Sequence, residues 1–221
     1  MLRRTLCSML LAISATSEAQ ISRPRPTAST DPEYWVGLSI GYMDGITTTD
    51  EATGATWRFG YTSQLRATFE KTVATGTTVG VVAGYATGPL TYYPANQFTT
   101  ACPGSCLAKA DITQYLAFVR GGGGGGWGVG TRFRGTFNAE GGVTRFSKFR
   151  DRSAETPLAP DGGSYDFTVG FGAGFGYRVS QLSEIYVDQS YDFIFHKQSS
   201  TVTNQEVPRL LTFRGGFRFG F

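Results

Sequence analysis

The sequence predicts an all-β protein, an eight-stranded antiparallel up-and-down transmembrane β-barrel. Side chains alternate between apolar and polar in blocks of about 10 to 15 residues, the connections between blocks alternate between short and long, and the last block ends on Phe221. No long apolar run occurs after the N-terminal stretch, whereas a helix that spans a bilayer needs about 20 apolar residues. A helical membrane protein is therefore excluded.

The N-terminus has the features of a targeting segment. Arg3 and Arg4 precede a short apolar stretch from Leu6 to Ile13, and Ser17-Glu18-Ala19 is a small-x-small cleavage signal. We therefore predict a signal peptide at residues 1–19. Secretion together with the predicted transmembrane barrel indicates a location in the bacterial outer membrane. Residues 20–32 are rich in proline and lack apolar periodicity, which predicts a flexible periplasmic leader before a barrel at 33–221.

The clearest block runs from Trp57 to Glu70. Its odd positions, beginning with Trp57 and Phe59, are largely apolar, whereas its even positions, beginning with Arg58, are polar or glycine. The block at residues 165–178 repeats this split, with aromatic residues at both ends of the apolar row, as in a lipid-facing strand with two aromatic girdles. The other predicted strands are Tyr34–Met43, Thr78–Ala86, Asp111–Arg120, Thr131–Phe146, Glu184–Phe195 and Val207–Phe221. The facing of 111–120 is ambiguous, because apolar and polar residues share a parity there.

The connections distinguish the two ends of the barrel. Segments 44–55, 87–110, 147–164 and 196–206 are long and polar, while 71–77, 121–126 and 179–183 are short. Long extracellular loops and short periplasmic turns are typical of such barrels, so we expect both termini on the periplasmic side. The six glycines at 121–126 precede neither a Lys-Ser/Thr pair nor a helix pattern, which favours a turn over a phosphate-binding loop.

The polar parity of the strands predicts a charged lumen. The interior of an eight-stranded barrel is only wide enough for side chains, and buried charges there must be paired. We predict a salt-bridged plug, with Asp188 near Arg214 and Glu184 near Arg218 across the last hairpin. The predicted lumen residues are Arg58, Arg66, Glu70, Arg132, Arg134, Glu140, Asp166, Arg178, Glu184, Asp188, Asp192, Arg214 and Arg218.

Cysteine and histidine usage limits the chemistry. Cys102 and Cys106 flank a Pro-Gly turn, and secretion permits a disulfide between them. His196 is the only histidine, so we expect no metal site and no cofactor. The net charge of +3 comes without a basic stripe, so we expect no binding to nucleic acid.

The C-terminal strand carries the sharpest motif. Arg214, Gly216, Phe219 and Phe221 follow the order polar-x-Gly-x-x-aromatic-x-aromatic. In this the chain resembles the small outer-membrane barrels of the OmpA/OmpX type, over residues 33–221. The resemblance implies that this strand is the signal read by the barrel-insertion machinery. It also implies outer-membrane lipids and lipopolysaccharide as the surroundings.

Three functions remain open at this point. The first is a non-enzymatic surface barrel whose loops, around Cys102–Cys106 and at 147–164, serve envelope integrity, adhesion or binding of an extracellular partner. The second is a narrow pore for ions or small molecules, for which the inward glycines of 165–178 would leave room. The third is a lipid A-modifying enzyme, which would need His196 with Ser199 or Ser200 and Asp192. Because a nucleophile needs a well-placed base and HKQSS lacks a typical arrangement, we favour a protein that is not an enzyme.

Overall fold

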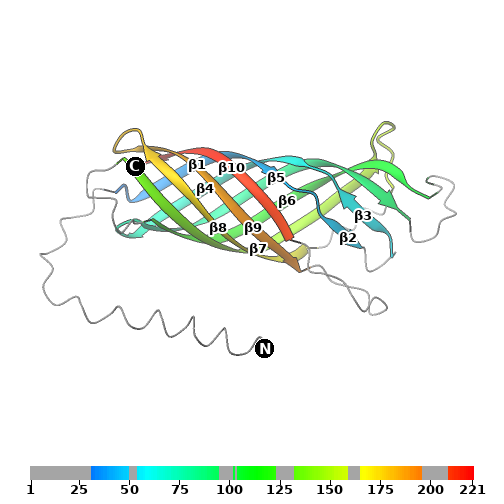
Figure 1. The fold of residues 1–221 in the computed structure, drawn as a ribbon, viewed down its shortest axis with the longest axis horizontal. Coiled ribbons are helices and arrows are strands. Elements are labelled where there is room, and N and C mark those ends of the chain that lie inside the picture. The colour runs from blue at the N-terminus through cyan, green and yellow to red at the C-terminus, as the bar shows by residue number, and fades with distance from the viewer. Residues whose placement is uncertain are drawn as a thin grey trace, which may run out of the picture. The chain divides into compact units, whose positions relative to one another are not determined.

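A closed antiparallel β-barrel forms the structure, a computed structural model that describes residues 31–49, 54–94, 102, 104–122, 132–158, 165–195 and 209–221. The predicted signal peptide lies outside these residues. Each long strand pairs with the next, and β1 closes the ring with both β4 and β10 (Figure 1). This confirms the predicted fold. The barrel strands are β1 (Tyr34–Met43), β4 (Thr62–Ala74), β5 (Thr77–Tyr93), β6 (Cys106–Gly122), β7 (Phe133–Asp151), β8 (Tyr165–Arg178), β9 (Ser183–Phe195) and β10 (Arg209–Gly220).

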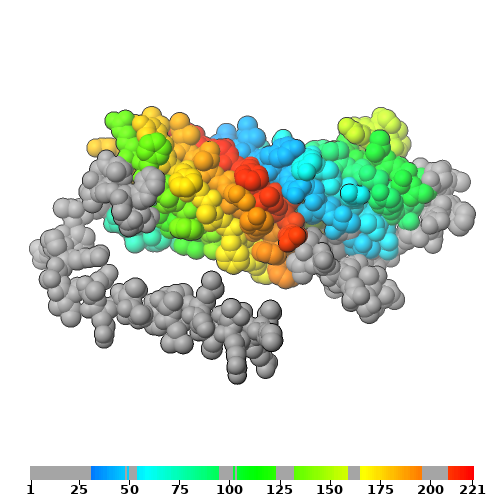
Figure 2. Space-filling view, in the orientation of Figure 1, coloured from blue at the N-terminus to red at the C-terminus, as the bar shows by residue number. Residues whose placement is uncertain are grey.

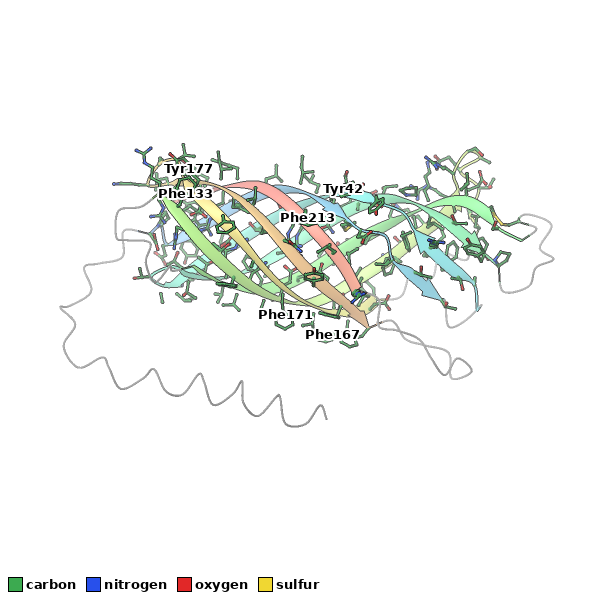
Figure 3. The ribbon with its side chains drawn as sticks, in the orientation of Figure 1. Tyr42, Phe133, Phe167, Phe171, Tyr177 and Phe213 are labelled. Atoms are coloured by element: carbon green, nitrogen blue, oxygen red, sulfur yellow. A yellow bond between two sulfur atoms is a disulfide. The ribbon has the colours of Figure 1, made fainter. Side chains whose placement is uncertain are left out.

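The outer surface is an apolar belt. Along β8 the side chains of Phe167, Phe171 and Phe175 are more than half exposed, whereas the even-numbered positions face inward. Figure 3 shows Phe171, Phe213 and their neighbours projecting from the wall. A water-soluble monomer does not expose a continuous apolar surface of this size. The belt is therefore the surface that lipid covers.

Aromatic residues border this belt at both ends. Tyr42 stacks on Tyr61 at the long-loop end, with ring centroids 5.5 Å apart. At the short-turn end Phe133 packs on Tyr177 at 4.8 Å, and Tyr34 stacks on Phe221 at 5.9 Å. Aromatic side chains with a polar edge suit the two membrane interfaces.

The predicted strand from Trp57 to Glu70 is two strands with opposite facing. A short β3 (Thr56–Phe59), paired with β2 (Thr47–Thr49), is separated from β4 by Gly60 and Tyr61. Phe59 is opposite Leu90 on β5, but Gln64 is opposite Ala86, so the β3–β4 segment contains one extra residue. A bulge of this kind reverses the facing of every residue beyond it.

A second bulge lies at the same height on β7. Lys109 of β6 is opposite Arg150, but Asp111 is opposite Ser147, and Lys148 takes a left-handed φ of 52°. Pro89, which cannot donate a ladder hydrogen bond, lies between the two bulges on β5 and accepts one from the Gly60 N–H at 2.8 Å. Above this line we define the extracellular extension, named for the side on which the long loops were predicted to lie, as β2, β3 and residues 87–93, 106–111 and 147–158.

The strands β5, β6 and β7 are longer than the sequence predicted, because their outer parts belong to the extension, where apolar side chains face inward instead of outward. Beyond the bulges, small and aliphatic side chains such as Leu90 and Ala108 face inward, while Arg58 and Lys109 face outward. A lipid-facing pattern, which places apolar residues outside, does not find such segments. Segments predicted as loops at 87–110 and 147–164 therefore contain strand. Figures 1 and 2 show these strands continuing together beyond the ends of β8, β9 and β10.

Candidate functional site: the lumen and its two ends

A charged layer occupies the lumen near the short-turn end. Glu70 is fully buried and accepts hydrogen bonds from Arg120 at 2.7 Å and from Arg218 at 2.9 Å. A second nitrogen of Arg218 donates to Glu184 at 2.9 Å, and the guanidinium lies over the Trp35 ring, 4.5 Å from its centroid. Planar guanidinium groups serve two carboxylates at once, which explains why arginine fills these positions.

A second charged layer lies above the first. Glu140 receives two hydrogen bonds from Arg66, at 2.7 and 3.3 Å, and one from Arg214 at 3.5 Å. Arg214 also donates through Nε to Asp188 at 2.5 Å. The register of the last hairpin places Arg214 opposite Asp188 and Arg218 opposite Glu184. Both pairs expected from the sequence are thus brought together.

A neutral polar layer separates the charges from the long-loop end of the barrel. Gln64 donates to Gln114 at 2.8 Å, Gln114 donates to Thr144 at 3.3 Å, and Thr144 shares a hydrogen bond with Thr168 at 2.7 Å. These residues come from four strands, β4, β6, β7 and β8, and are fully or almost fully buried. The sequence analysis did not single them out, although the inward parity of β4 and β6 is their common signal.

A column of inward glycines on β8 makes room for the carboxylates of β9. A Cβ atom on Gly170 would approach an oxygen of Asp192 to 2.4 Å, and one on Gly176 would approach an oxygen of Glu184 equally closely. A Cβ on Gly174 would meet the Cβ of Asp188 at 2.6 Å. At these positions the room that the inward glycines were expected to leave for a pore is occupied by side chains of β9.

Two of the predicted lumen residues lie elsewhere. Arg58 is exposed on the outer face of β3, because the bulge at Gly60–Tyr61 reverses the facing of that segment. Arg132 precedes β7 and is exposed at the short-turn end, where it donates to the Tyr177 hydroxyl at 3.4 Å. Asp166 and Asp192 are buried inside the barrel as predicted from their parity.

Two residues of the lumen network were not predicted. Arg120 faces inward because the even positions of β6 point to the lumen, where Leu116 and Phe118 pack with Val82; this settles the ambiguous facing of that strand. Asp31 was assigned to the flexible leader, but it is bonded to the barrel at the short-turn end. The compact unit therefore begins at Asp31 rather than at residue 33.

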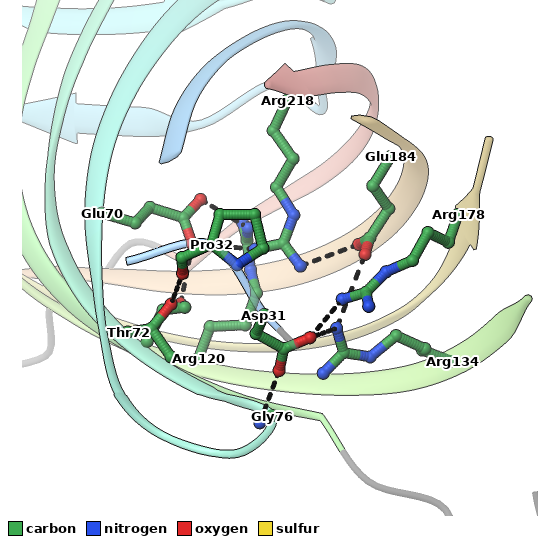
Figure 4. A network of polar contacts seen from close by, with 11 residues as sticks. Asp31, Pro32, Glu70, Thr72, Gly76, Arg120, Arg134, Arg178, Glu184 and Arg218 are labelled. Atoms are coloured by element: carbon green, nitrogen blue, oxygen red, sulfur yellow. Dashed lines mark hydrogen bonds and ion pairs between the residues drawn. The ribbon is translucent and has the colours of Figure 1, made fainter. Parts of the chain in front are cut away.

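Asp31 closes the short-turn end of the lumen. Its carboxylate accepts hydrogen bonds from Arg178 at 2.5 Å and from the Gly76 N–H at 3.1 Å, and Arg134 lies 3.8 Å away (Figure 4). Burial acts to raise the pKa of Asp31, but these hydrogen bonds and the charges of Arg134 and Arg178 outweigh it. The pKa therefore lies below its ordinary value of 3.8.

An apolar core fills the opposite end and continues into the extracellular extension. The Trp57 ring lies 4.1 Å from Tyr92 and 3.9 Å from Phe149, centroid to centroid. Phe149 reaches this core because the bulge at Lys148 turns it inward. Cys102 and Cys106 are joined by a disulfide at the edge of the same core, with their Cα atoms 5.7 Å apart.

The C-terminal motif divides between the two faces of β10. Arg214 and Gly216 face the lumen, and a Cβ on Gly216 would collide with Ser39 and Tyr186. Phe219 and Phe221 lie on the outer surface and are about half exposed. No group of His, Cys, Asp and Glu within the described ranges is arranged to hold a metal ion. In the same ranges there is no helix long and apolar enough to cross a membrane.

Comparisons with known proteins bear on the fold. No protein-family model and no curated protein sequence matches the chain. The chain is similar to the crystal structure of neisserial surface protein A, with a TM-score of 0.52 and 12% identity over 86% of this chain and 97% of that one. It is also similar to outer membrane protein OprG from Pseudomonas aeruginosa, with a TM-score of 0.54 and 15% identity over the same shares. The lipid-facing belt, the closed ring of strands and these two likenesses show that the chain has the fold of the small eight-stranded β-barrels of the bacterial outer membrane, as its resemblance to the OmpA/OmpX type implied.

Proposed function

We propose that the chain is a non-enzymatic outer-membrane barrel with a closed lumen, whose extracellular extension serves adhesion, envelope integrity or binding of a partner outside the cell. The observation that carries this proposal is the extension itself. Five strand segments rise beyond the belt, and all of them except β2 contribute to an apolar core around Trp57. Ordered structure beyond the lipid belt is costly to maintain in a barrel that only needs to seal itself.

The extension presents a fixed surface. Asp151 accepts hydrogen bonds from the backbone N–H groups of Ser153 and Ala154 at 2.8 and 2.7 Å, which folds residues 151–155 into a tight turn. Arg150 ties this turn to the strands, since it donates to Glu155 at 3.0 Å and to Asp111 at 3.2 Å. A surface that is already ordered loses little entropy on binding. Residues 159–164, the rest of the loop predicted at 147–164, lie outside the described residues.

The lumen supports a closed barrel rather than a pore. Ion pairs of Glu70 and Glu140 cross the lumen at two levels, and the glycine column of β8 is occupied by the carboxylates of β9. We expect purified protein in planar lipid bilayers to show no steady channel openings. Stable single-channel currents would support the narrow pore instead.

The position of Asp192 gives no support to an enzyme acting on lipid A. Of the residues that such an enzyme would need, it is the one that the structure describes. Asp192 is 1% exposed and lies inside the lumen beside Gly170, where a lipid outside the barrel cannot reach it. His196, Ser199 and Ser200 lie outside the described residues. Hydrolysis of labelled lipid A by the wild-type protein, lost in His196→Ala, would overturn this reading.

A matched pair of variants tests the role of the extension. Tyr93 and Leu107 are exposed on its outer face, by 40% and 60%, and apolar anchors of this kind dominate protein interfaces. We expect Tyr93→Ser/Leu107→Ser to lower adherence of expressing cells to a host-cell monolayer, or their detergent resistance, by roughly tenfold. Leu182→Ser, at the short-turn end, removes a similarly exposed side chain and should change neither. The proposal fails if both variants behave like wild type or if both lose the property equally.

A further inference from the structure

The short-turn mouth contains a carboxylate-binding site built from three separate elements. Arg134 comes from β7, Arg178 from the end of β8 and the Gly76 N–H from the turn between β4 and β5. All three converge on one carboxylate, that of Asp31, whose side chain is only 10% exposed (Figure 4). Two guanidinium groups and a backbone N–H form a donor set typical of anion sites.

Gly76 is specialised for this role. It has a left-handed φ of 75°, and a Cβ atom there would come within 2.0 Å of the Gly122 carbonyl oxygen. Its N–H points to the carboxylate while its own carbonyl accepts a hydrogen bond from the Gly122 N–H at 2.6 Å. The turn is thus held from the neighbouring strand in the conformation that presents this N–H to the mouth.

The charge of the mouth requires an anion at this position. Four arginines gather there, and Glu70 and Glu184 are engaged by Arg218, Arg120 and Arg134. Without Asp31, Glu70 and Glu184 would be the only carboxylates in the described part of this layer to balance the four cations. A buried or half-buried cation left without a counter-charge is costly, so a free anion would be drawn into the vacated position. The four arginines are Arg120, Arg134, Arg178 and Arg218.

Asp31 occupies the site from outside the strand framework. It precedes β1, and the segment is anchored by the Pro32 carbonyl, which accepts a hydrogen bond from Thr72 at 2.5 Å, and by the Glu33 carbonyl, which accepts one from the Thr72 N–H at 2.8 Å. The ladder between β1 and its neighbours begins only at Tyr34 and Trp35. The carboxylate can therefore leave without breaking a strand pairing.

We propose that Arg134, Arg178 and the Gly76 N–H form an exchangeable binding site for a small carboxylate at the periplasmic mouth, of which Asp31 is the resident occupant. A narrow cleft, lined by Asp31, Trp35, Arg134 and Arg218 among others, adjoins the site and has room for little more than a water molecule. A carboxylate therefore binds to the arginines only in the position that Asp31 vacates. The site lies at the opposite end of the barrel from the extracellular extension and does not depend on the function proposed for it.

Chemical rescue tests this proposal. Asp31→Ala removes the resident carboxylate, and we expect a lower midpoint of urea unfolding in lipid vesicles containing chloride. Sodium formate at the same ionic strength should recover most of the lost midpoint and saturate with concentration, while leaving the wild-type midpoint unchanged. The fluorescence of Trp35, which lines the cleft, should titrate over the same range in Asp31→Ala.

Two double variants separate a specific site from a general salt effect. Asp31→Ala/Arg178→Gln lacks the principal donor and should lose the rescue, whereas Asp31→Ala/Arg58→Gln changes an exposed arginine at the other end and should keep it. If Asp31→Ala does not fold in chloride, a greater refolded fraction in formate is the same test. A midpoint equal to wild type, formate acting no better than chloride, or rescue that survives Arg178→Gln would each overturn the proposal.

Discussion

Replacing Glu70 with glutamine should be among the most destabilising isosteric changes in the barrel. Glu70 is fully buried, and its two oxygens accept hydrogen bonds from Arg120, Arg218 and the Thr78 hydroxyl at 2.7, 2.9 and 2.7 Å. All three are charge-assisted, because their acceptor is a carboxylate, and each contributes about 1.5–3 kcal/mol. Removing one member of a buried ion pair costs about 3–5 kcal/mol, because the remaining charges stay buried. We therefore expect Glu70→Gln to lower the free energy of unfolding by about 3–5 kcal/mol.

Reversible urea unfolding in lipid vesicles, followed by tryptophan fluorescence and by the mobility of unboiled protein on gels, measures this loss. Thr78→Val is the matched control, since it removes one hydrogen bond from a neutral donor to the same carboxylate, leaves every charge in place and should cost about 1.5–3 kcal/mol. Glu70→Gln/Arg218→Met should recover part of the loss, because one uncompensated cation is gone. If Glu70→Gln costs no more than Thr78→Val, the lumen charges do not act as a stabilising network and the reasoning is refuted.

Three further predictions concern the belt, the extension and the mouth. Phe171→Arg places a charge at the middle of the lipid-facing row of β8 and should lower the free energy of unfolding by about 2–4 kcal/mol, measured by urea titration in lipid vesicles. Phe171→Leu should be tolerated. Trp57→Ala, which empties the extension core, should cost about 3–5 kcal/mol locally and speed proteolysis of the extension, while an unchanged cleavage rate would contradict its role. Because the pKa of Asp31 lies below 3.8 despite burial, chiefly through Arg178, its stabilisation is complete above that pH and is lost as pH falls through the folded pKa. The difference in unfolding free energy between wild type and Asp31→Asn should therefore be constant near neutrality and should disappear below about pH 4. A difference that persists at low pH would contradict the ion pair.

The belt and the charged pairs of the last hairpin were predictable because each depends on parity alone. Phe171 and its neighbours alternate with glycine along an uninterrupted strand, so one face had to meet lipid. Asp188 and Arg214 follow from the antiparallel register across a single loop. In both cases the period of two persists over the whole segment, and no bulge intervenes.

The extension was not predictable in the same way, because a single inserted residue reverses the facing. Trp57 and Phe59 continue the odd-numbered apolar row of β4 in sequence, yet they point inward once Gly60 and Tyr61 are accommodated. Nothing in a period-two pattern locates such an insertion. Asp31 was missed for a different reason: its ordering comes from arginines far away in the chain, not from its own neighbours.

The glycine column of β8 has an evolutionary consequence. At Gly170 and Gly176 one volume is shared by two adjacent strands, so that either a side chain on β8 or the carboxylate of Asp192 or Glu184 on β9 can fill it, but not both. Substitutions at these paired sites cannot be accepted independently, since a larger residue on β8 requires a smaller one on β9 in the same lineage. Among homologues, a larger side chain at one of these β8 positions should therefore accompany a smaller side chain at its partner on β9. The lipid-facing rows should differ, because each of their positions can change independently.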